Sequence, residues 1–162
     1  MAAMLVLEPI FEADLQQEQY AYRTGKNALE AINHVHRLLN TGYSEVVDAD
    51  LTGYFDNIPH PELMKSITRR IVDRRIIHLI KMWLIVPVEE KDERRHKHST
   101  TGNRDNRLGI PQGSPISPLL SNLYIRRFVL GWKQLGFEDE LKAYIVNYAD
   151  DLVICCNTIS HN

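Results

Sequence analysis

Lys142-Ala-Tyr-Ile-Val-Asn-Tyr-Ala-Asp-Asp-Leu-Val-Ile-Cys-Cys156 is the stretch of this sequence that decides the fold. Two apolar runs, 142–148 and 152–156, flank a polar centre, and this pattern predicts a β-hairpin with Asp150 and Asp151 at its tip. Aspartate is common in tight turns, so the pair alone is also consistent with plain turn chemistry. Carboxylates crowded at the ends of buried strands, however, repel one another and lose hydration unless a cation binds them.

A second acidic strand is predicted upstream, in Glu45-Val-Val-Asp-Ala-Asp-Leu51. Its apolar residues lead to Asp50, and Asp48 shares the face of Asp50 because strand side chains alternate. We expect Asp48 to be a solvated neighbour and not a ligand. Oxygen-only ligands favour Mg²⁺ or Mn²⁺. Two such ions, about 3.5–4 Å apart, would stabilise the attacking and leaving oxygens of a phosphoryl transfer.

The rest of the chain predicts helices joined by polar, turn-rich segments. Gly109-Ile-Pro-Gln-Gly-Ser-Pro115 is typical of a turn. The charged stretch 89–107 has few apolar residues and predicts a loop or hairpin. Apolar residues at helical spacing predict helices over 5–15, 27–40, 61–72, 73–84 and 117–135.

Composition is that of one soluble domain: 162 residues, 44% hydrophobic and 25% charged. The sequence has no apolar run long enough for a membrane span and no signal-peptide pattern, and Cys155 and Cys156 are adjacent. We therefore expect a reduced, cytosolic protein without a membrane partner.

Net charge is −2, yet the charges are unevenly distributed. The stretch 64–133 holds 15 Lys and Arg against 6 Asp and Glu, whereas the rest of the chain is strongly acidic. A basic middle between acidic flanks suits a protein that contacts phosphate while concentrating carboxylates elsewhere. Solvated helix faces would give the same pattern.

Five blocks, in order, resemble the group II intron reverse transcriptases. Val47-Asp-Ala-Asp-Leu-Thr-Gly-Tyr-Phe-Asp-Asn-Ile-Pro-His60 resembles their first catalytic motif, and Gly109-Ile-Pro-Gln-Gly-Ser-Pro-Ile-Ser-Pro-Leu-Leu-Ser-Asn-Leu-Tyr124 the next one. Tyr148-Ala-Asp-Asp151 is the polymerase signature in that family's form. Leu7-Glu-Pro-Ile-Phe-Glu-Ala13 and Tyr22-Arg-Thr-Gly-Lys26 resemble the segment between fingers and palm. The resemblance covers about 5–156.

The resemblance implies a role for each matched position. The catalytic residues would be Asp50, Asp150 and Asp151, and these three would bind two Mg²⁺ ions, replaceable by Mn²⁺, together with Leu51. The nucleotide would meet Phe55, Gln112, Gly113, Tyr148 and Ala149. Phe55 would exclude a 2′-hydroxyl, although a core aromatic is the plainer interpretation. Nucleic acid would meet Arg23, Lys26, Arg69 and Arg70, which could equally be surface cations.

The implied fold is α+β: an incomplete right-hand polymerase palm, an antiparallel sheet backed by the helices near 61–84 and 118–135, with part of the fingers. We expect lower-fingers helices over 1–42, a palm over 43–157 and a tail over 158–162. Family members carry upper fingers, a thumb and a maturase domain, so the chain is expected to be a truncated reading frame or a fragment. It would be weak or inactive alone and would form a homodimer through the surface that truncation exposes.

The implied activity is RNA-directed DNA synthesis, in which a dNTP is added to a DNA primer on an RNA template, with intron RNA as a further partner. One alternative is an inactive remnant that only binds RNA or forms oligomers. Another is a nucleotide cyclase built on a similar palm, which would need a glycine-rich hairpin turn. Tyr148-Ala-Asp-Asp151 lacks that turn.

Overall fold

The predicted hairpin and the predicted upstream strand form one antiparallel sheet. A computed structural model describes residues 2–91 and 97–157, so the expected tail lies outside the described residues. The chain divides into two compact units. The sheet unit comprises residues 12–52 and those from 125 onward, and the helical unit comprises 1–11 and 53–124.

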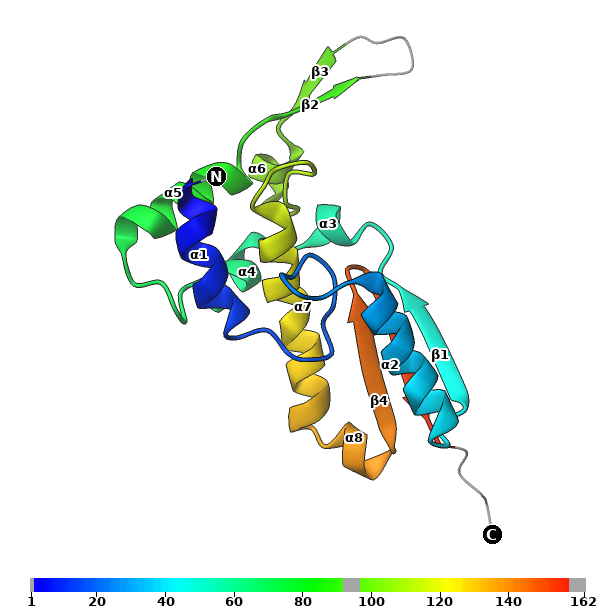
Figure 1. The fold of residues 1–162 in the computed structure, drawn as a ribbon. Coiled ribbons are helices and arrows are strands. Elements are labelled where there is room, and N and C mark those ends of the chain that lie inside the picture. Colours follow the sequence, from blue (N-terminus) through cyan, green and yellow to red (C-terminus); the bar gives the residue numbers. More distant parts are fainter. Residues whose placement is uncertain (1, 92–96, 158–162) are drawn as a thin grey trace. The chain divides into compact units, whose positions relative to one another are not determined.

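In the sheet unit, β1 (Glu45–Asp50), β4 (Ala143–Tyr148) and β5 (Asp151–Cys156) pair in the order β1-β5-β4. Both pairings are antiparallel, so β5 lies in the centre and β1 and β4 form the edges (Figure 1). The β1–β5 register places Asp50 opposite Asp151. The two apolar runs around the acidic turn are therefore the arms of a hairpin, as the sequence predicted.

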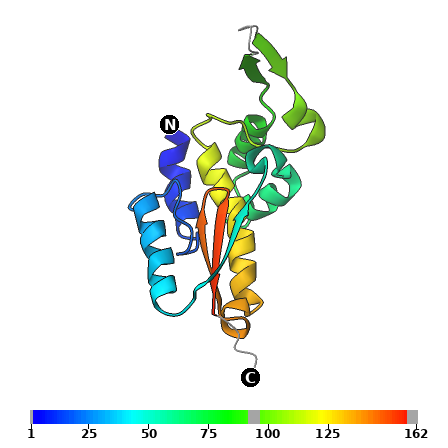
Figure 2. The same cartoon turned by 90° about the vertical axis from the view of Figure 1, so that its right-hand side faces the viewer.

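Helices lie along this sheet (Figure 2). Helix α2 (Ala28–Asn40) lies against β4 and β5 and begins with a capping box in which Asn27 and Glu30 bond each other's backbone amides. The second half of α7 (Ser117–Gln134) also packs here, since the indole nitrogen of Trp132 donates to the carbonyl of Ala143 at 2.9 Å. The short α8 (Phe137–Glu140) then leads into β4.

Burial follows the hairpin arms but not β1. Ile145, Val146 and Leu152 are buried, as predicted for apolar strands. In β1, Val46 and Val47 are about half exposed and Asp50 is exposed. The apolar strand that ends at Asp50 is thus largely exposed; it is an edge strand within its unit, and its outer side pairs with no strand of the described residues.

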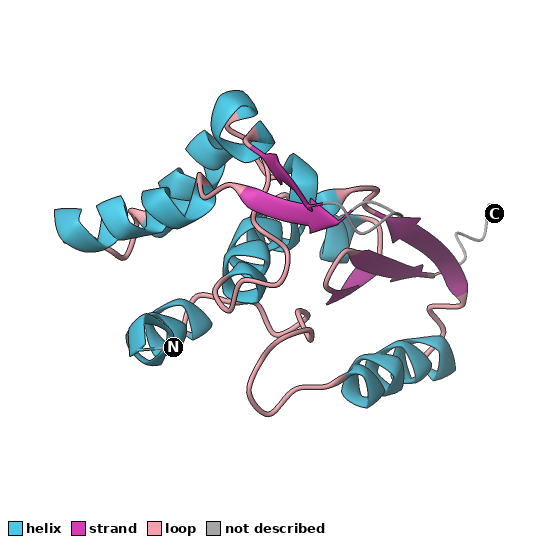
Figure 3. Cartoon of the chain, turned by 90° about the horizontal axis from the view of Figure 1, so that it is seen from above, coloured by secondary structure: helices cyan, strands magenta, loops and turns pink. Residues whose placement is uncertain are grey.

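The helical unit contains most of the remaining elements, including a second, two-stranded sheet (Figure 3). Its core is aliphatic and includes Ile58, Leu63, Ile67, Ile80 and Leu84. The elements are α1 (Ala2–Glu12), α3 (Tyr54–Asn57), α4 (His60–Ile67), α5 (Arg74–Leu84), β2 (Val88–Lys91), β3 (Lys97–Thr100), α6 (Gly102–Asn106) and the first half of α7.

Several predicted boundaries move for identifiable reasons. The helix predicted from Pro61 to Val72 ends at Ile67, where the Thr68 hydroxyl donates to the carbonyl of Met64 at 2.9 Å. Asp73 caps the next helix by accepting from the amide of Arg75 at 2.7 Å. The short helices α3, α6 and α8 were not predicted, since one turn is too short to show a helical period. No helix of 2–91 or 97–157 is long and apolar enough to span a bilayer.

The turn between β1 and α3 can be tested by a substitution at Gly53. Its φ of 62° is left-handed, and a Cβ there would lie 2.9 Å from Nδ2 of Asn57, which itself donates to the Gly53 carbonyl. Gly53→Ala should therefore lower the free energy of unfolding by about 1–2 kcal/mol, measured by urea denaturation. The control is Gly131→Ala in α7, where a Cβ meets open space and should stabilise by about 0.4–1 kcal/mol. Equal effects of the two substitutions would contradict this account.

Candidate active site

The three predicted catalytic aspartates belong to the same end of one sheet. Asp50 closes β1, Asp151 opens β5 opposite it, and Asp150 lies in the turn between β4 and β5. Directly opposed residues on antiparallel strands have Cα atoms about 4.5–5.5 Å apart. The amide of Leu51 also donates to the carbonyl of Asp150 at 3.2 Å, so the end of β1 is fastened to the turn.

The turn itself has an unusual backbone. Ala149 is buried and has a φ of 56°, a left-handed conformation that costs a non-glycine residue free energy. Asn147 holds this turn, because its side-chain nitrogen donates to the carbonyls of Ala149 at 2.8 Å and of Asp151 at 3.1 Å. Sequence reasoning missed Asn147, since an asparagine at the end of an apolar strand gives no signal until the turn is folded.

The negative charges at this end of the sheet act on one another. Partial burial raises the pKa of Asp151, and the neighbouring carboxylates of Asp150, Asp50 and Asp48 raise it further. A positive ion bound among these groups would relieve the repulsion. The crowding predicted from the sequence is thus present, although Asp50 and Asp151 are both exposed.

The side chains are not gathered into a ready-made metal cage. Among the described residues, no group of three or more His, Cys, Asp or Glu side chains is arranged to hold a metal ion. The aspartates that the resemblance assigns to two Mg²⁺ ions are thus not drawn together as a cage, and their mutual repulsion without a cation acts against such an arrangement. The donor set still fits Mg²⁺ or Mn²⁺, because all three are carboxylates: Asp50 and Asp151 are register partners, and Asp150 directly precedes Asp151.

The sheet face that carries Asp151 is only partly covered. A groove of about 640 Å³ lies between α2 and the sheet. Its floor includes Val146, Tyr148, Asp151 and Val153, and apolar residues of α2 form its wall. Tyr148, predicted to meet the nucleotide, is 37% exposed and is the cross-strand partner of Asp151.

The remaining predicted nucleotide residues lie together in the helical unit. The amide of Ile110 donates to the carbonyl of Phe55 at 2.8 Å, which joins the two motifs. The side-chain nitrogen of Gln112 donates to the Asp56 carboxylate at 3.2 Å. Gly113 has a φ of 82°, which favours glycine there. The Phe55 ring is half-buried and contacts the Tyr54 ring edge-on. It is therefore not a fully buried core aromatic, and part of the ring stays accessible to solvent.

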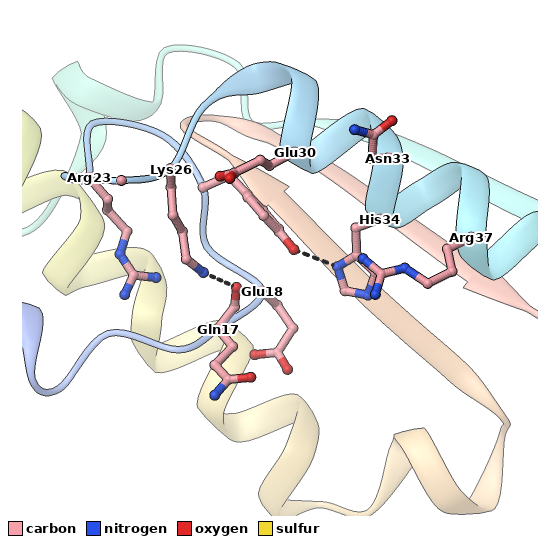
Figure 4. Close-up of a pocket in the computed structure, with 10 residues that line it drawn as sticks. Gln17, Glu18, Arg23, Lys26, Glu30, Asn33, His34 and Arg37 are labelled. Atoms are coloured by element: carbon pink, nitrogen blue, oxygen red, sulfur yellow. Dashed lines mark hydrogen bonds between the residues drawn. The ribbon is translucent and has the colours of Figure 1, made fainter.

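Arg23 and Lys26 line a polar pocket of about 730 Å³ in the sheet unit (Figure 4). The Arg23 side chain is 7% exposed, pairs with the Glu12 carboxylate and donates to the carbonyls of Gln16 and Gln19. Its donors thus fasten its own loop, and this placement gives Arg23 a structural role. Nucleic-acid contact by Arg23 stays a prediction.

Lys26 and the neighbouring helix form the other wall of this pocket. The Lys26 ammonium bonds the carbonyl of Gln17 and lies 4.6 Å from the centre of the Tyr20 ring, whose hydroxyl bonds Nδ1 of His34 at 2.8 Å (Figure 4). Burial lowers the pKa of His34, and the cations Arg37 and Lys26 lower it further. Neutral His34 therefore suits the hydrogen bond to Tyr20.

Arg69 and Arg70 lie at the surface of the helical unit, between α4 and α5. Arg74 and Arg75, in the first turn of α5, are exposed as well. Val72, between the two pairs, is 87% exposed. The predicted basic cluster is therefore accessible to a large anionic partner.

An antiparallel sheet with acidic residues at a strand end and at a hairpin tip is the arrangement of a polymerase palm. A family model described as reverse transcriptase (RNA-dependent DNA polymerase) matches residues 1–161. The chain therefore belongs to the reverse transcriptase family.

Curated relatives agree with the group II intron resemblance seen in the motifs. Protein YkfC of Escherichia coli strain K12 is 33% identical over 131 residues, which is 78% of this chain and 32% of that protein. Group II intron-encoded protein LtrA of Lactococcus lactis subsp. cremoris is 30% identical over 135 residues, 82% of this chain and 21% of that protein. The chain spans about a third or less of the length of these relatives.

Solved structures confirm the predicted fold class. Apo telomerase from Candida tropicalis, truncated from its C-terminal domain, matches with a TM-score of 0.64 at 14% identity, over 96% of this chain and 34% of that one. A chain of a partial Cas6-RT-Cas1–Cas2 complex matches with a TM-score of 0.51 at 29% identity, over 97% of this chain and 25% of that one. The telomerase likeness shows the fold alone.

Asp151 gives a test of the crowded charges. The pKa of Asp151 in the folded chain lies above its ordinary value, so the ionised carboxylate destabilises the fold. This destabilisation disappears when the pH falls below the folded pKa and the group is protonated. Asp151→Asn should therefore raise the melting temperature in metal-free buffer at neutral pH by a few degrees. It should also reduce the further rise that Mn²⁺ gives the wild-type chain. Calorimetry with and without Mn²⁺ measures both effects.

The matched control is Asp139→Asn, which removes an exposed carboxylate of the same unit away from the turn. It should leave the Mn²⁺ response unchanged. A melting temperature that falls in Asp151→Asn, with an undiminished response to Mn²⁺, would contradict the charge-crowding account.

Proposed function

We propose that this chain is the catalytic palm of a group II intron-type RNA-directed DNA polymerase, which adds a deoxynucleotide to a primer on an RNA template. The observation that carries the proposal is the β1–β5 register, which pairs Asp50 with Asp151 at the turn that holds Asp150. Family membership supports the reaction class. The similarity to LtrA supports intron RNA as a further partner.

Asp50, Asp150 and Asp151 would hold two Mg²⁺ ions, and Leu51 would contribute from the end of β1. When bound, such ions supply charge stabilisation for the entering and leaving oxygens of phosphoryl transfer. Bound cations would neutralise the repulsion among these side chains. The backbone that carries the side chains is fastened by the bond from the Leu51 amide to the Asp150 carbonyl.

The helical unit would hold the nucleotide. Phe55 would lie under the sugar and exclude a 2′-hydroxyl, while Gln112 and Gly113 would border the new base pair. This placement is supported by the hydrogen bond from the Ile110 amide to the Phe55 carbonyl. The bond holds the segment of Phe55 beside the segment of Gln112 and Gly113. In the sheet unit, Tyr148 and Ala149 would meet the nucleotide as well.

Synthesis by this chain alone is expected to be weak. Holding primer, template and nucleotide in line is worth about 7–11 kcal/mol of the barrier, and the chain spans about a third or less of the length of its relatives. We further propose a homodimer, since β1 is an edge strand whose outer side pairs with no other strand among the described residues and which carries half-exposed valines. We also propose that the protein acts in the prokaryotic cytosol or nucleoid.

Primer extension on poly(rA)/oligo(dT) tests the reaction. The wild-type chain should add dTMP slowly in the presence of Mg²⁺ or Mn²⁺. Asp50→Asn should reduce the rate by about a thousandfold or more, since a lost metal ligand removes several kcal/mol of stabilisation. Asp139→Asn serves as the control and should keep the wild-type rate.

Two results would overturn the proposal in different ways. Activity that survives Asp50→Asn would mean that this carboxylate is not catalytic. A folded wild-type chain without any synthesis would favour the inactive remnant, which then acts only by binding RNA or forming oligomers.

RNA binding should be weak, salt-sensitive and indifferent to sequence. Arg69→Gln should lower the slope of log affinity against log salt concentration by about 0.7–0.9, the value of one phosphate contact. Lys65→Gln is the control, because Lys65 already pairs with Glu62 at 2.7 Å. Fluorescence anisotropy with a labelled RNA measures the slope, and an affinity that does not change with salt would exclude the electrostatic account.

A further inference from the structure

Asn147 is a buried polar residue at the end of β4, directly before the turn that carries Asp150 and Asp151. Its side chain is fully enclosed. A buried amide destabilises a fold unless hydrogen bonds replace the lost water. The partners of Asn147 therefore show what its amide contributes.

The side chain of Asn147 spans the turn. Its nitrogen donates to the carbonyl of Ala149 at 2.8 Å and to the carbonyl of Asp151 at 3.1 Å. Because both acceptors are carbonyl oxygens, only the amide nitrogen can face them, which fixes the orientation of the group. The two bonds clamp the left-handed Ala149, a conformation that alanine adopts only at a cost.

The main chain of Asn147 is held from the other direction. Its amide donates to the carbonyl of Glu18 at 2.8 Å, and its carbonyl accepts from the amide of Tyr20 at 3.0 Å. Glu18 in turn pairs with Lys133 of α7 at 2.8 Å. The residue is thus anchored to the 18–20 segment while its side chain holds the turn.

The amide leaves one atom unpaired. Oδ1 of Asn147 is buried and has no hydrogen-bond partner among the described residues. Leucine has the same branched skeleton with larger methyl groups, and it would remove the unpaired oxygen together with both donors to the turn. The unpaired oxygen is a cost at this position, and the two bonds to the turn are what the asparagine side chain contributes.

We propose that Asn147 is a positioning residue, whose side chain fixes the carbonyls of Ala149 and Asp151 and so the backbone from which the Asp150 and Asp151 carboxylates reach a divalent cation. This inference rests on the proposed function, in which those carboxylates hold the metal. Loss of the side-chain bonds should change metal affinity and turnover more than stability.

The test uses two variants of the full chain, Asn147→Leu and Asn147→Ser. Leucine removes both bonds to the turn and the unpaired oxygen, and keeps the main-chain bonds to Glu18 and Tyr20. Serine keeps one donor for the two carbonyls. Mn²⁺ affinity by electron paramagnetic resonance, melting temperature and primer-extension kinetics are measured for each.

Asn147→Leu should keep the wild-type melting temperature within a few degrees and lose Mn²⁺ affinity by about tenfold or more. Its kcat should fall by up to about 100-fold, the effect of a displacement near 1 Å, with a smaller change in KM for the nucleotide. Asn147→Ser should lie between leucine and wild type in both Mn²⁺ affinity and kcat.

Wild-type Mn²⁺ affinity and kcat in the leucine variant would overturn the inference. A fall in melting temperature that accounts for the lost affinity would overturn it too, because the role would then be structural. Should leucine fail to fold, a folded serine variant with unchanged Mn²⁺ affinity would decide against the inference. Absence of Mn²⁺ binding in the wild-type chain would remove the proposed function and this inference together.

Discussion

The antiparallel pairing of β1 with β5 is the constraint on which the candidate site depends. It places Asp50 opposite Asp151, and the bond from the Leu51 amide to the Asp150 carbonyl extends the same ladder into the turn. A slip of one residue in this register would move Asp50 to the other face of the sheet, since strand side chains alternate. Two segments about a hundred residues apart in the sequence thus form one acidic cluster because backbone hydrogen bonds align them.

Burial and neighbouring charges both act on the aspartates of this cluster. The pKa of Asp151 is raised by partial burial and by its acidic neighbours, so the fold holds carboxylates that repel one another until a cation arrives. The turn between them is fastened by Asn147, whose own Oδ1 is left without a partner among the described residues. Such costs are typical of functional sites, where the geometry of a few groups matters more than the most stable packing.

Cations that look alike in the sequence occupy different environments. Arg23 is enclosed and fastens its own loop through Glu12 and two carbonyls, whereas Arg69 is exposed between two helices. Only the exposed group has its charge available to a phosphate chain, so the basic segment of the helical unit is the better candidate for RNA contact. A short sequence motif cannot separate these two cases, because the partners of Arg23 come from residues up to eleven positions away.

The sequence by itself determined the hairpin, the acidic strand and the family, because apolar runs and ordered motifs are local signals. It also located most helices, and it extended the helix after Pro61 to Val72, beyond the actual end at Ile67. Only the tertiary structure decided that β5 lies between β1 and β4, that β1 is an exposed edge and that Asn147 clamps the turn. These features depend on contacts between distant segments. The free energy of such contacts cannot be deduced from the residue pattern of any one segment.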